Sequence, residues 1–233
     1  MQIYKQKNRM TIFNTLKWRL AQFLELLWWK RYLTKKEVKE YAIWKKEYWN
    51  SFIVKTGVGE YLNKDTLALD VGCGPAGIFI SLNEQQVVAV DPLISSYESN
   101  LEHFNRSNYP NVSFVSKAFE DFETEKGFDL IFCLNAVNHF RDFRFSIEKL
   151  QAMLNKGGVL VLSIDVHRFL FFKHLFRIIP GDALHPHQHS RSDYIGFMKS
   201  FSSLGLLSHQ VLNKGNIFNY EVLIFKSKTN NGG

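Results

Sequence analysis

The sequence predicts an α/β fold: a doubly wound, mostly parallel sheet with two helices added at its N-terminus. Short apolar runs alternate with segments of helical pattern, which is typical of parallel strands connected through helices. Two further apolar runs close the chain and are joined by a turn at 214–216. The predicted strands are Leu67–Val71, Val87–Val90, Val112–Val115, Phe128–Leu134, Val159–Ile164, Ser208–Leu212 and Tyr220–Lys226.

Length and composition indicate one globular unit. The chain has 233 residues, of which 45% are hydrophobic and 22% charged, so it can bury one good core but is short for two. Two cysteines cannot build a disulfide framework, which favours a reducing, cytoplasmic location. No run of 18 apolar residues predicts a membrane-spanning helix, and the first residues lack the pattern of a signal peptide.

The N-terminal segment differs from the rest in charge and in aromatic content. Residues 1–50 hold twelve Lys/Arg, four Asp/Glu and all five tryptophans, whereas the other 183 residues are almost neutral. Helical spacing predicts a helix over Thr15–Leu33, with apolar residues on both of its sides. The spacing of Thr34 and Glu37 fits a capping box, so a second helix is expected from about Lys35. We therefore expect residues 1–60 to form a helical extension or lid on a main domain of residues 61–233.

This basic, aromatic segment is open to three interpretations. It is a solvated helix pair covering the active site, a membrane-surface contact through residues 15–50, or an RNA contact. No recognised RNA-binding module accompanies it, so nucleic acid is the weaker partner hypothesis.

A strand, a glycine-rich turn and a second strand form the most informative stretch. Leu67–Val71 leads into Gly72–Gly77, which is expected to turn tightly and open a helix. The next strand ends in Asp91, 21 residues after Asp70. In such units glycines let the backbone approach a ligand, and the acidic residue accepts hydrogen bonds from ribose hydroxyls. The stretch therefore predicts a nucleotide-type cofactor site.

The motif Asp70-Val-Gly-Cys-Gly-Pro-Ala-Gly77 resembles the first motif of class I S-adenosylmethionine (SAM) methyltransferases of the small-molecule type. With Asp91, FDLIFCLNAVNHF and LNKGGVLVLSID, the resemblance extends over residues 65–226. It implies a Rossmann-like sheet of seven strands with the last one antiparallel, and SAM as the cofactor. It also implies site residues: Asp70, Gly72, Gly74 and Gly77 at the amino-acid end of SAM, Asp91 at the ribose, Ala118, Phe119 and Glu120 by the adenine, and Asn135 beneath the sulfonium. Lys117 departs from the pattern, because an acidic residue often precedes the Ala118 position.

Histidines are the candidate catalytic residues. Methyl transfer from a sulfonium needs alignment and exclusion of water, and it needs a base only when the acceptor carries a proton at neutral pH. His139, beyond the fourth strand, is the first candidate base, with a structural role as the alternative. His185, His187 and His189 alternate along a loop, as rim residues of the substrate pocket or as simple loop structure. A metal site is a further reading of these three residues, but we predict none.

These patterns favour a cytoplasmic enzyme that methylates a small-molecule or lipid- or sugar-linked acceptor at oxygen, with a location peripheral to the membrane as the alternative. An RNA methyltransferase is the first alternative, and a catalytically silent SAM-binding protein is the second. No N-P-P-Y-like tetrapeptide follows the fourth strand, and Cys133 lacks a preceding proline. Methylation of adenine amino groups and of pyrimidine C5 are therefore disfavoured.

Overall fold

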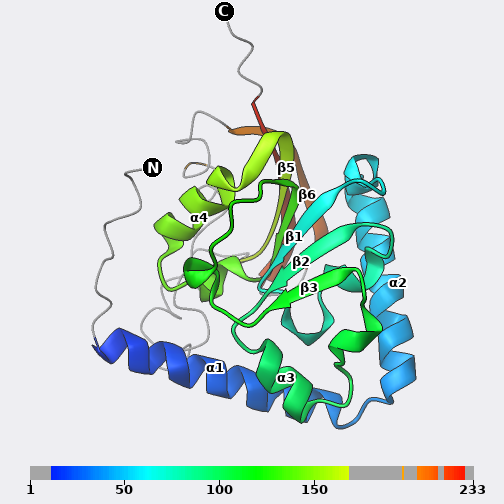
Figure 1. The fold of residues 1–233 in the computed structure, drawn as a ribbon, viewed down its shortest axis with the longest axis vertical. Coiled ribbons are helices and arrows are strands. Elements are labelled where there is room, and N and C mark those ends of the chain that lie inside the picture. Colours follow the sequence, from blue (N-terminus) through cyan, green and yellow to red (C-terminus); the bar gives the residue numbers. More distant parts are fainter. Residues whose placement is uncertain (1–11, 168–195, 197–203, 215–217, 229–233) are drawn as a thin grey trace, which may run out of the picture.

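The computed structural model describes residues 12–167, 196, 204–214 and 218–228. In these residues seven strands form one sheet in the order β3-β2-β1-β4-β5-β7-β6 (Figure 1), which confirms the predicted fold class. The strands are β1 (Leu67–Val71), β2 (Gln86–Val90), β3 (Val112–Val115), β4 (Phe128–Leu134), β5 (Leu154–His167), β6 (Leu204–Lys214) and β7 (Phe218–Ser227).

Strand direction brings the predicted site residues to one edge of the sheet. Strand β7 runs antiparallel to β5 and β6, and the other neighbouring strands pair in parallel. In the register, Val71 at the end of β1 lies opposite Val90 of β2 and Cys133 of β4. The turns after β1, β2 and β4 therefore start at the same level, at the carboxyl edge where ligands bind in open parallel sheets.

The sheet is buried on both faces because alternate residues of a strand point to opposite sides. On one face, side chains such as Phe132, Val161 and Ile224 pack with Trp49 and Phe52 from the N-terminal region. On the other face the core contains Ile131, Leu160, Leu162, Leu223 and Phe225 from the strands, and Ile147 and Leu150 from α4 (Phe143–Ala152). The central strands thus read as continuous apolar runs.

The two predicted N-terminal helices are present as α1 (Ile12–Leu33) and α2 (Val38–Thr56). The expected capping box between Thr34 and Glu37 is wrong. The Thr34 hydroxyl donates to the Lys30 carbonyl and so ends α1, whereas Glu37 is itself the N-cap of α2 and accepts from the Glu40 N–H at 2.7 Å. Within the described segments no helix has both the length and the apolar content needed to cross a bilayer.

Three expected helices differ in the structure. The glycine turn opens no α-helix but two 3-10 turns, Gly74–Ala76 and Ile78–Ser81. The helix expected over 95–105 is the shorter α3 (Ile94–Asn100), and the one expected over 146–154 is α4, which begins three residues earlier because Asp142 caps it at the Phe145 N–H. The helix expected over 192–203 lies outside the described residues, apart from Gly196, which is helical.

Candidate active site at the carboxyl edge of the sheet

The turn after β1 lies against the turn after β4. Gly72 has a φ of 64°, a conformation that costs an L-residue with a side chain, and a Cβ built on it would be 2.3 Å from the Cβ of Ala136. The Gly72 N–H donates to the Val90 carbonyl at 2.7 Å, which also ties this turn to β2. Glycine at this position therefore allows three strand ends to converge.

Asp70 packs against the glycine turn. Its carboxylate is buried and accepts the Phe79 N–H at 3.2 Å. A Cβ built on Gly77 would be only 2.5 Å from the Asp70 Oδ2. Burial raises the pKa of Asp70 to about 7, and the backbone hydrogen bonds from Phe79 and Ile78 oppose that rise. The side chain thus holds the loop in a shape that only glycine at 77 permits.

Asp91 joins the end of β2 to the glycine turn. Its Oδ2 accepts the Gly74 N–H at 3.0 Å and its Oδ1 accepts the Leu93 N–H at 2.8 Å. Burial, and then the negative charge of Glu25 on α1, raise the pKa of Asp91 to about 7. A carboxylate has about four lone-pair sites, so two remain for hydroxyl donors. These residues fit a ribose diol placed beside the glycine turn.

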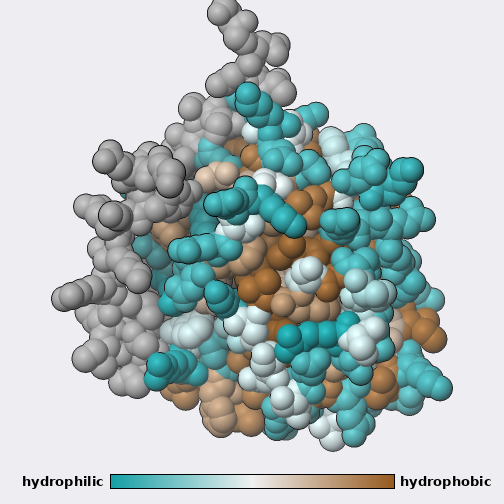
Figure 2. Space-filling model, in the orientation of Figure 1, coloured by the Kyte–Doolittle hydropathy of each residue, from teal (hydrophilic) through white to brown (hydrophobic). Residues whose placement is uncertain are grey.

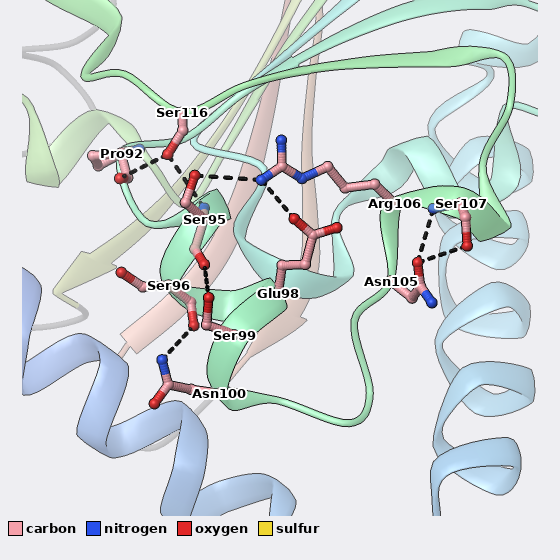
Figure 3. A network of polar contacts seen from close by, with 10 residues as sticks. All are labelled: Pro92, Ser95, Ser96, Glu98, Ser99, Asn100, Asn105, Arg106, Ser107 and Ser116. Carbon is pink, nitrogen blue, oxygen red and sulfur yellow. Dashed lines mark hydrogen bonds and ion pairs between the residues drawn. The ribbon is translucent and has the colours of Figure 1, made fainter.

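The segment after Asp91 is tied to the end of β3 by a polar network (Figure 3). The Arg106 guanidinium pairs with Glu98 at 2.7 Å and donates to the Ser95 hydroxyl at 3.3 Å. The Ser95 N–H donates to the Ser116 hydroxyl at 3.2 Å, and that hydroxyl donates to the Pro92 carbonyl. The network fixes the backbone around the predicted ribose and adenine positions relative to each other.

Helix α1 crosses the carboxyl edge of the sheet (Figure 1) and contacts each of these turns. The Tyr97 hydroxyl donates to Glu25 at 3.2 Å, and the Trp29 ring lies 3.6 Å from where a Cβ on Gly74 would stand. Near the other end of α1, the Arg141 guanidinium lies 5.3 Å from the centre of the Trp18 ring. No pattern in the sequence predicted these three contacts with α1. The only feature of the sequence that could have indicated one of them is that Glu25 is the single acidic residue of α1.

The predicted adenine residues divide into two groups. Ala118 and Phe119 are buried, and the Phe119 ring stacks on Phe140 with centroids 5.6 Å apart. Glu120 turns to the loop after β4, where its carboxylate accepts the Arg141 N–H at 2.5 Å and pairs with the Arg141 guanidinium. Glu120 thus shapes that loop through Arg141, and its contact with adenine stays a prediction.

Asn135 follows β4 directly, as predicted, and has a φ of 55°. Its N–H donates to the Ser163 hydroxyl of β5 at 2.9 Å, and that hydroxyl donates to the Asn135 side-chain oxygen at 3.2 Å. Ser163 is fully buried and was not singled out in the sequence. The pair of bonds locks the end of β4 to β5, so the turn that follows starts from a fixed point.

His139 ends a 3-10 turn, Val137–His139, and is half-buried. The turn begins next to Ala136, the residue that meets Gly72, so His139 lies where the sequence placed it, just beyond β4. His185, His187 and His189 lie outside the described residues, and their roles stay predictions. Among the described residues no cluster of three or more His, Cys, Asp or Glu could hold a metal ion.

The fold and this site define a class I, SAM-dependent methyltransferase. The glycine turn after β1, the acidic residue ending β2 and the seven-stranded sheet with one antiparallel strand occur together here. Residues 62–177 match the family model described as "Methyltransferase domain", and the chain belongs to the SAM-dependent class I methyltransferases.

Relatives of known function share this part of the chain. A tRNA U34 carboxymethyltransferase of Campylobacter fetus is 32% identical over 122 residues, which make up 49% of this chain and 42% of that protein. A ubiquinone biosynthesis O-methyltransferase of Rickettsia bellii is 28% identical over 101 residues, 42% of each chain. The chain thus spans less than half the length of these curated relatives.

Solved structures share the fold. Magnesium protoporphyrin IX methyltransferase of Synechocystis, with bound S-adenosylhomocysteine (SAH), superposes with a TM-score of 0.62 at 15% identity and covers 92% of this chain and 99% of that one. SAH is the product that SAM leaves after it gives up its methyl group. The cofactor of this chain is SAM, as the resemblance predicted.

Proposed function

We propose that this chain transfers the methyl group of SAM to an oxygen of a small-molecule or lipid- or sugar-linked acceptor. The observation that carries the proposal is the position of His139, three residues beyond the Ala136–Gly72 contact. A hydroxyl acceptor carries its proton at neutral pH, so a base beside the strand end is needed as the oxygen attacks. Similarity to an O-methyltransferase supports the choice of oxygen.

The residues of this chain would bind and orient both reactants. Asp91 would accept the ribose hydroxyls, the turn Gly72–Gly77 with Asp70 would hold the amino-acid end, and Asn135 would lie beneath the sulfonium. Bound SAM would supply an electron-poor methyl group on its positively charged sulfur. We infer that residues 1–60 act as a lid and residues 61–233 as the SAM-binding domain. The contacts of Trp18, Glu25 and Trp29 with the strand-end turns support a lid that excludes water.

The acceptor proton would pass to a histidine. His139 is our first choice, and His185, His187 and His189 remain candidates as rim residues of the acceptor pocket. The two cysteines are unpaired and buried, which supports a reducing, cytoplasmic location, and a lipid-linked acceptor would place the enzyme at the membrane surface.

RNA is the second candidate acceptor. Similarity to a tRNA-modifying enzyme and the excess of Lys/Arg in residues 1–50 favour it. Against it, the described basic residues of α1 lie among exposed apolar side chains rather than on a continuous cationic surface.

The test is SAH release on three panels: hydroxylated small molecules, lipid- or sugar-linked alcohols, and tRNA. His139→Ala should lower turnover on the preferred acceptor by roughly 10²–10⁴ while SAH affinity stays constant. His103→Ala is the matched control, because His103 contacts the Lys36 carbonyl at 2.9 Å in the α1–α2 connection. Turnover on tRNA alone would replace the proposal by the RNA alternative. SAH binding without turnover on any panel would favour a silent binding protein.

A further inference from the structure

Helix α1 is apolar on two opposite sides. Its inner side, which includes Ala21 and Leu33, is buried against the domain, and Glu25 faces Tyr97 there. Its outer side carries large apolar residues that remain exposed: Leu20, Phe23, Leu24, Leu27 and Trp28, with exposed fractions from 37% to 56%. A surface helix normally has one apolar side, so the outer one needs an explanation.

The exposed residues form a continuous stripe, which we name the outer stripe of α1. Residues 20, 23 and 27, and likewise 20, 24 and 28, are three or four positions apart, so the five side chains share one face over roughly 12 Å of helix length. Figure 2 shows hydrophobic surface along the lower margin of the molecule, where α1 runs in Figure 1. The Trp28 ring is held in place by stacking on Tyr32, with centroids 4.9 Å apart.

Positive charge accompanies the outer stripe. Arg19 and Lys30 lie along one margin and Arg31 lies at its C-terminal end, and all three are exposed. Glu25 is the only acidic residue of α1, and it faces inward. The outer face of α1 therefore combines large apolar side chains, a tryptophan and cations without any anion.

We propose that the outer stripe of α1 docks on an anionic lipid bilayer, with its apolar side chains in the interface and its cations on lipid headgroups. A second copy of the chain fits less well, because a two-fold interface would bring Arg19, Lys30 and Arg31 of both copies together. The role of this docking rests on the proposed function, because docking would bring the carboxyl edge of the sheet to a lipid-linked acceptor.

The test uses the full chain, vesicles and no acceptor. The protein should sediment with phosphatidylcholine vesicles that contain about one-third phosphatidylserine, and much less with phosphatidylcholine alone or at high salt. The double variant Phe23→Gln/Trp28→Gln should weaken binding by about tenfold or more. Ile43→Gln/Val54→Gln on α2 is the matched control, since both residues are at least as exposed as those of the stripe, and it should bind like the wild type.

Charge is tested by a second pair. Lys30→Gln/Arg31→Gln should lose more affinity for the anionic vesicles than Lys46→Gln/Lys55→Gln, whose residues are exposed on α2. Unchanged SAH affinity shows that each variant is folded. Wild-type protein that stays in the supernatant, equal binding by stripe and control variants, or a wild-type dimer that the stripe variant dissociates would each overturn the proposal. None of these outcomes depends on methyl transfer, so failure here and failure of the proposed acceptor chemistry are distinguished.

Discussion

Asp91→Asn tests the cofactor site at its most connected residue. The carboxylate accepts two backbone N–H groups, from Gly74 at 3.0 Å and from Leu93 at 2.8 Å. Asparagine keeps one acceptor oxygen, and its amide nitrogen must face the other N–H, so donor meets donor. The neutral amide also replaces the charged acceptor that we expect for the ribose hydroxyls. Loss of such a charged hydrogen bond costs about 1.5–3 kcal/mol, which corresponds to an SAH affinity roughly 10- to 150-fold lower.

Calorimetric titration with SAH measures this change. Asp129→Asn is the control, because Asp129 also accepts a backbone N–H, that of Leu67 at 3.0 Å, but lies at the opposite edge of the sheet. Affinity within twofold of the wild type in Asp91→Asn, or an equal loss in Asp129→Asn, would refute the assignment of Asp91 to the ribose.

The same variant has a pH signature. The pKa of Asp91 is about 7 in the folded chain against an ordinary value of 3.8, so the folded state binds this proton more tightly. The resulting stabilisation is complete below pH 3.8 and is lost as the pH rises through 7, and Asp91→Asn should lack that decline. SAH affinity should rise across pH 7 in the wild type, because the ionised carboxylate is the better acceptor for ribose hydroxyls, and it should rise less in the variant.

Two further substitutions probe the supports of the glycine turn. Gly72→Ala should weaken SAH binding and lower the free energy of unfolding, because its Cβ would force the turns after β1 and β4 apart at a φ that already costs an L-residue about 1–2 kcal/mol; a fully stable variant in chemical denaturation would contradict this. Trp49→Phe should cost about 1–3 kcal/mol in the same measurement, because it leaves the buried Ala76 carbonyl without the indole N–H that now donates to it at 2.9 Å, and an unchanged denaturation midpoint would show that this bond is dispensable.

Local patterns predicted the strands well and their surroundings less well. β1, β3 and β4 begin and end where the sequence placed them, since each is an apolar run bounded by turn residues or charges. The expected α-helix after the glycine turn gave way to 3-10 turns. Pro75 lacks a backbone N–H, and the Phe79 N–H donates to the carboxylate of Asp70, nine positions earlier in the sequence. Propensity alone does not register such a competing acceptor.

The partners of the site were the harder part to predict. Asp70, Gly72 and Asp91 could be singled out because motif spacing marks them, and the structure brings them together. Glu25 and Ser163 approach the site from distant segments, and no local spacing links them to it. The bond of Glu120 to the loop after β4 depends likewise on how two loops pack, which the sequence does not state.

The position of α1 in the sequence affects how the chain folds during its synthesis. This helix is synthesised well before the residues that it contacts, because Tyr97 follows Glu25 by 72 positions and Arg141 comes later still. Until β1, β2 and β4 have assembled, the inner apolar side of α1 cannot pack on the domain, and both of its apolar sides are exposed. We therefore expect this helix to be prone to aggregation during synthesis, because transiently exposed apolar surface favours association between chains. Moving α1 to the C-terminus by circular permutation should relieve that burden during synthesis and raise the yield of folded protein.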